Sequence, residues 1–128
     1  MTTKGTSIGR VRGLGSARHG ARQWLLERFT GLASLFTSLY LLVSLVMLSD
    51  LQYATVREWI AQPLVATVLA LFVIANFWHT RLGLQMVIED YVHEGANKFA
   101  TLALLNLAVF AGAAYGLLCI LRLALGVA

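Results

Sequence analysis

The stretch His79-Thr-Arg-Leu-Gly83-Leu-Gln-Met-Val-Ile-Glu-Asp90-Tyr91 decides how this chain is interpreted. It closes the second of three apolar segments and carries ionisable side chains on what is predicted to be one helix. Ionisable groups within a membrane segment are costly and are associated with function. The remainder of the chain is therefore interpreted as a support that holds this stretch at a fixed depth and orientation.

The composition is that of a membrane protein. The 128 residues are 59% hydrophobic and only 12% charged, with a mean hydropathy of +0.75, whereas soluble domains carry about a quarter charged residues. This length allows one domain. The lone Cys119 has no partner for an internal disulfide and no metal-ligand pattern around it.

Three segments are long and apolar enough to cross a bilayer. The sequence predicts spans at about residues 26–49, 63–90 and 98–122, because roughly 20 apolar residues of helix cover the hydrocarbon core. Pro63 suits the first turn of the second span, and a short interfacial helix is expected around Trp59. The predicted fold is all-α, with a three-helix transmembrane anchor at 23–128 after an arm at 1–22.

The predicted arm is basic and rich in glycine. It contains no acid, and its basic residues are Lys4, Arg10, Arg12, Arg18 and Arg22. Mitochondrial transit peptides share this charge, but five glycines oppose the amphipathic helix that such a peptide needs. The arm lacks interleaved aromatic residues and leads directly into a span, so we expect contact with lipid headgroups or a partner and no nucleic acid. The positive-inside rule places the N-terminus in the cytoplasm.

Helical spacing predicts which ionisable residues of the second span share a face of the helix. Asp90 lies about 16 Å along the axis from His79 and only roughly 20° around it, so the two share a face. With Asp90 at the inner interface, His79 lies near the bilayer midplane. Gly83 is one turn from His79 and leaves room for something flat beside the imidazole. Arg81 is turned about 200° from His79, and Tyr91 about 120° from it.

Each of these residues has two interpretations on its own. His79 is either an axial haem ligand or a histidine that hydrogen-bonds a neighbouring helix. Tyr91, steadied by Asp90, is either a phenol donor to a carbonyl ligand or a member of the interfacial aromatic belt. Arg81 can pair with a partner's acid, line a polar cavity or contact a cofactor carboxylate.

Outside the second span, His19, Arg22 and Arg28 either meet haem propionates or an acidic partner surface, or form a plain positive-inside cluster. His93 and Glu94 are expected to lie in a solvated loop. No nucleophile–base–acid set, phosphate-binding loop or multi-ligand metal motif occurs. We therefore expect no self-contained enzyme and no catalytic residue within this chain.

The chain resembles the small hydrophobic membrane anchor of succinate dehydrogenase (respiratory complex II), and bacterial members in particular. The resemblance covers nearly the whole chain: a basic tail, a His-then-Arg approach to the first span at His19 and Arg28, and three spans. Its specific part is the pattern His-x3-Gly-x6-Asp-Tyr, met by His79, Gly83, Asp90 and Tyr91.

The resemblance implies a subunit of succinate:ubiquinone oxidoreductase in the bacterial inner membrane. Two anchors would form a helical bundle around one haem b, with His79 as this chain's axial ligand to iron. Tyr91 would bind ubiquinone with Asp90 beside it, and Arg28, with His19, would lie near the haem propionates. The implied partners are a flavoprotein, an iron–sulfur subunit and a cytochrome b anchor.

Two alternatives remain open at this point. The first is the anchor of a quinol:fumarate reductase, which runs the same reaction backwards. The second is a non-catalytic membrane scaffold or transporter subunit, in which His79, Arg81 and Asp90 form a polar pathway. The direction of catalysis, the quinone species and the partner's axial ligand are not encoded in this chain.

Overall fold

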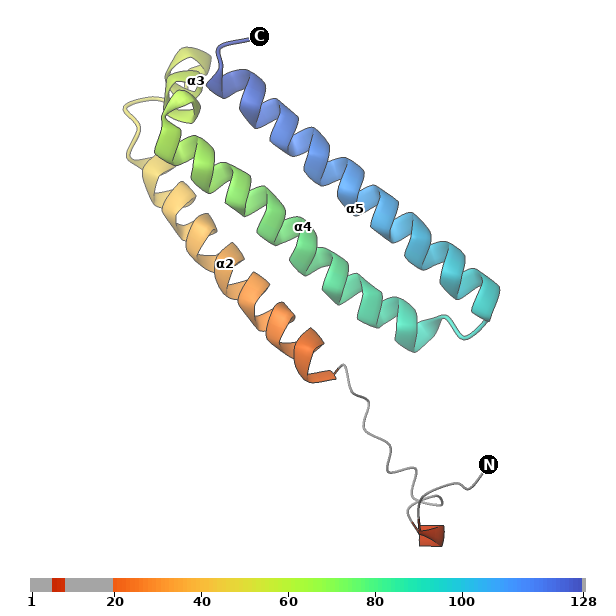
Figure 1. Cartoon of the computed structure of the whole chain (residues 1–128). Coiled ribbons are helices and arrows are strands. Elements are labelled where there is room, and N and C mark those ends of the chain that lie inside the picture. The colour runs from red at the N-terminus through yellow and green to blue at the C-terminus, as the bar shows by residue number, and fades with distance from the viewer. Residues whose placement is uncertain (1–5, 9–19, 128) are drawn as a thin grey trace.

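Three long helices lie side by side with α4 in the middle (Figure 1). The structure, a computed structural model, describes residues 6–8 and 20–127. Its helices are α2 (Gly20–Val46), α3 (Tyr53–Ala61), α4 (Pro63–Tyr91) and α5 (Gly95–Ala124). In this part of the chain α4 contacts both α2 and α5, while α2 and α5 do not contact each other. The predicted all-α fold with three helices of membrane-spanning length is confirmed.

The helices do not end where the apolar runs end. α2 begins at Gly20, inside the stretch predicted as the arm, and stops at Val46, short of Ser49. Hydrophobicity marks the bilayer, whereas a helix continues into the headgroup region wherever its backbone bonds remain satisfied. The remainder of the arm, apart from residues 6–8, lies outside the described residues, and so does His19.

α3 closes one end of the layer. It is the helix expected around Trp59, whose indole is buried against Leu41 and Val65. Pro63 occupies the first turn of α4, where its missing N–H is not needed. Before α3, the Asp50 carboxylate accepts hydrogen bonds from the Thr55 hydroxyl at 2.6 Å and from the backbone N–H of Gln52 at 3.0 Å. These bonds hold the pKa of Asp50 below its ordinary value.

Glycines allow α4 to approach both neighbours. A Cβ at Gly112 of α5 would lie 2.6 Å from the Phe77 ring, and one at Gly116 would lie 3.2 Å from Val73. On the opposite side, a Cβ at Gly31 of α2 would lie 3.3 Å from Cε1 of His79. These contacts are the close packing that small residues permit between membrane helices.

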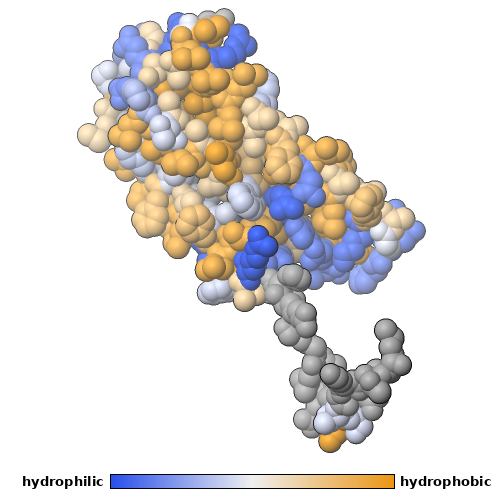
Figure 2. Space-filling model, viewed as in Figure 1, coloured by the Kyte–Doolittle hydropathy of each residue, from blue (hydrophilic) through white to orange (hydrophobic). Residues whose placement is uncertain are grey.

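Most apolar side chains point outward. Phe29 of α2 and Phe110 of α5 are each 70% exposed, and the buried core is small. Figure 2 shows hydrophobic residues over most of the middle of the visible face, with hydrophilic residues gathered towards the ends. A single layer of helices with this surface requires lipid or another membrane protein around it.

Substituting Gly112 by valine will destabilise the α4–α5 packing, because the new side chain overlaps the Phe77 ring. Overpacking of this kind costs about 1–3 kcal/mol, which will lower the thermal midpoint of the protein in detergent. Gly95→Ala is the control, since nothing lies within 4 Å of a Cβ there. Equal midpoints for the two variants would contradict the packing argument.

Candidate functional site

His79 faces α2 from the middle of α4. Its Nδ1 lies 3.2 Å from Oγ1 of Thr30, and its ring passes over the backbone at Gly31. Thr30 is 5% exposed and is a buried polar residue of the described chain. The imidazole is thus held against α2 by one polar and one steric contact.

An open hollow of about 380 Å³ lies beside this imidazole, and we call it the His79 hollow. It is lined by Glu27, Arg28, Gly31, Leu32, Leu35 and His79. The Arg28 guanidinium also lies over the Trp24 ring, 5.6 Å from its centroid. Two of the predicted site residues, His79 and Arg28, therefore meet in one place, together with leucine side chains and the carboxylate of Glu27.

Asp90 lies on the same face of α4, as the helical spacing predicts. It lines a second hollow of about 330 Å³ with residues of α2, which we call the Asp90 hollow. Its lining residues are Gly20, Gln23, Trp24, Glu27, Met86, Glu89 and Asp90. Glu27 and the Trp24–Arg28 pair connect the two hollows along α2.

Tyr91 is not joined to these groups. It is the last residue of α4, its side chain is 80% exposed, and its hydroxyl makes no hydrogen bond to the described residues. Its backbone carbonyl lies 3.2 Å from Nδ1 of His93. The phenol therefore lies exposed at the end of the layer.

Gly83 has open space where a side chain would be, but it is not among the described residues that line the His79 hollow. The close approach to the imidazole comes instead from Gly31 of α2. The sequence alone did not pair Gly31 or Thr30 with His79. The sequence could not supply this pairing, because the spacing of residues along one helix does not determine how that helix is aligned with its neighbour.

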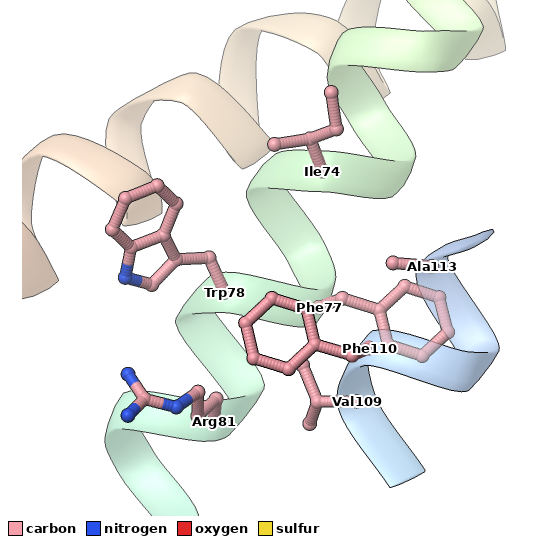
Figure 3. A pocket seen from close by; sticks show the side chains of 7 residues that line it. All are labelled: Ile74, Phe77, Trp78, Arg81, Val109, Phe110 and Ala113. Carbon is pink, nitrogen blue, oxygen red and sulfur yellow. The ribbon is translucent and has the colours of Figure 1, made fainter. Parts of the chain in front are cut away.

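Arg81 points to the other side of α4. Its Nε donates to Oδ1 of Asn106 on α5, and Asn106 Nδ2 donates to the Leu102 carbonyl at 2.8 Å. A hollow of about 380 Å³, the Arg81 hollow, adjoins the guanidinium and is drawn in Figure 3; it is lined by Ile74, Phe77, Trp78, Arg81, Val109, Phe110 and Ala113. The guanidinium therefore lies among aromatic side chains, away from the His79 hollow.

Within residues 6–8 and 20–127, no group of three or more His, Cys, Asp or Glu side chains is arranged to hold a metal ion. His79 offers a single nitrogen donor. A single donor would suit a haem, whose porphyrin supplies four ligands to the iron and leaves axial positions for protein side chains.

Comparisons with known proteins agree on one family. Residues 2–118 match the family described as "Succinate dehydrogenase/Fumarate reductase transmembrane subunit". The succinate dehydrogenase hydrophobic membrane anchor subunit of Rickettsia bellii is 29% identical over 103 residues, which are 80% of this chain and 81% of the relative. That of Rickettsia conorii is 29% identical over 86 residues, 66% of this chain and 68% of the relative.

Substituting Asn106 by leucine will destabilise the protein, because Arg81 then has no hydrogen-bond partner among the described residues. Leaving a polar group unpaired in an apolar setting costs about 1–3 kcal/mol, measurable as a lower thermal midpoint in detergent. Asn76→Leu is the matched control, since Asn76 bonds only the Phe72 carbonyl of its own helix. An equal effect of both substitutions would show that the interhelical bond contributes nothing.

Proposed function

The chain belongs to the succinate dehydrogenase/fumarate reductase transmembrane subunit family, and on that premise we propose that it carries part of a haem b site and part of a ubiquinone site. The observation that carries the proposal is the position of His79, the one imidazole among the described residues that line a hollow shared with Arg28. The chain acts as an anchor subunit of the complex.

Succinate dehydrogenase is favoured over fumarate reductase. The family description names both enzymes, but the Rickettsia relatives are all succinate dehydrogenase anchors. Electrons would then reach the membrane from a flavoprotein and an iron–sulfur subunit and pass to ubiquinone. A cytochrome b anchor would supply the second half of the bundle, in the inner membrane of a bacterium.

The residues of the His79 hollow suit a haem edge. The imidazole supplies an axial nitrogen, the leucines supply apolar contact, and Arg28 supplies a cation for a propionate. The Glu27 carboxylate would repel a propionate in this hollow, so the propionate would lie beside Arg28. A haem b bound there supplies one-electron redox chemistry at a potential set by its ligands and surroundings.

The ubiquinone site would lie at the end of α4 that adjoins the start of α2. There the Tyr91 phenol is free to donate a hydrogen bond to a quinone carbonyl, which strengthens as negative charge develops on that oxygen. Asp90, the residue before Tyr91, lines the Asp90 hollow at the same end of α4 and would form part of this end of the site. In the complex, the basic residues near the start of α2 favour the cytoplasmic side for this end.

Substituting His79 by alanine will remove most of the b-type absorbance of the dithionite-reduced complex, because the iron loses its ligand from this chain. Optical spectra of the purified complex measure this loss per flavin. His93→Ala is the control, since His93 is exposed in the α4–α5 connection. A full haem spectrum in the His79 variant would exclude the proposed ligand.

Substituting Tyr91 by phenylalanine will slow ubiquinone reduction by roughly tenfold or more, through loss of a donor to the developing charge. Succinate oxidation by an artificial dye will persist, because the dye takes electrons before the quinone site. Tyr53→Phe is the matched control: Tyr53 is similarly exposed at 69% but begins α3 at the opposite end of the layer (Figure 1). Equal loss of both activities would indicate failed assembly instead.

A further inference from the structure

The Thr30–His79 contact joins α2 to α4 by a hydrogen bond, the one between these two helices in the described part of the chain. Oγ1 of Thr30 and Nδ1 of His79 are 3.2 Å apart. Either atom can be the donor in such a pair, depending on the histidine tautomer. The surroundings of Thr30 decide between the two arrangements.

The Thr30 hydroxyl has one hydrogen and three acceptors within reach. Oγ1 lies 2.8 Å from the Leu26 carbonyl and 3.2 Å from the Glu27 carbonyl. A carbonyl can only accept, so the hydroxyl hydrogen is drawn to Leu26, the nearest acceptor. Oγ1 then presents a lone pair to His79, and Nδ1 must carry the hydrogen that completes the bond.

A neutral imidazole with its hydrogen on Nδ1 has its lone pair on Nε2. No group among the described residues hydrogen-bonds Nε2. Gly31 restricts the ring further, because the backbone of α2 lies close enough for a Cβ to approach Cε1 at 3.3 Å. Tautomer and ring position are thus both set by α2, in advance of any ligand.

We propose that Thr30, backed by the Leu26 carbonyl, is the positioning residue that holds His79 in the Nδ1–H tautomer and leaves Nε2 to ligate the haem iron. This inference rests on the proposed function, since it concerns the same histidine. Metal-bound histidines commonly donate their second N–H to such an acceptor, which fixes the ring and raises the basicity of the ligating nitrogen.

The test uses the complete purified complex. Thr30→Val keeps the side-chain shape but removes the acceptor, and we expect haem retention to fall by about 10–100-fold. Haem that remains will have a higher midpoint potential, because a less basic ligand stabilises the oxidised iron less. Thr30→Ser, which keeps the hydroxyl, will restore both values towards those of the unmodified complex.

Thr37→Val is the matched control. Thr37 lies on the same helix, and its hydroxyl likewise donates to a carbonyl of its own helix, that of Ala33 at 2.7 Å. It bonds no histidine. Equal changes in the Thr37 and Thr30 valine variants, or a Thr30→Val complex with unaltered haem retention and potential, would overturn the inference.

The failure of this inference differs from failure of the proposed function. Haem lost in His79→Ala but unaffected in Thr30→Val would overturn only the role of Thr30. Haem retained in His79→Ala would overturn both. If Thr30→Val does not assemble, a high-resolution map of the unmodified complex decides: iron on Nε2 with Nδ1 at hydrogen-bond distance from Oγ1 supports the role, and iron on Nδ1 or a separated threonine refutes it.

Discussion

The close approach of α4 to both neighbouring helices is the constraint on which the rest of the structure depends. No other long helix in the described chain touches two long partners, so α4 must offer a complementary surface on each side. Gly31 on one neighbour and Gly112 on the other make this approach possible. Between membrane helices the attraction comes from such packing and from interhelical hydrogen bonds, because lipid itself solvates apolar side chains.

The polar side chains of α4 lie on two faces, one toward each neighbouring helix. His79 and Asp90 turn toward α2, where the His79 and Asp90 hollows lie. Arg81 turns toward α5 and bonds Asn106 among aromatic side chains. Residues two apart on a helix point to nearly opposite sides, so the cation and the imidazole each have a partner from a different helix.

The sequence alone predicted the helices and which residues of each helix share a face. It did not predict the contacts between helices. Uncharged runs around Thr30 and Asn106 predicted membrane-spanning helices, and the rotation per residue correctly set His79 apart from Arg81. The start of α2 at Gly20 was missed because hydropathy reports the bilayer and not the helix. Thr30 could not be paired with His79, because their register depends on α3 and its loops, whose geometry the spacing of residues does not encode. The roles of Tyr91 and of a haem came from the family resemblance, because both depend on groups outside this chain.

The single-layer arrangement bears on how a haem would act in the assembly. The His79 hollow is open, and the described residues that line it include one imidazole. On the proposed function, the second axial ligand and the rest of the pocket would therefore come from another subunit. On the proposed function, haem then binds the assembled anchors and not the separate chains. A ligand that binds only the assembled state stabilises that state by mass action. The haem would thus hold the anchor pair together as well as exchange electrons, and a Thr30 that fixes the imidazole beforehand would lower the ordering cost of that assembly.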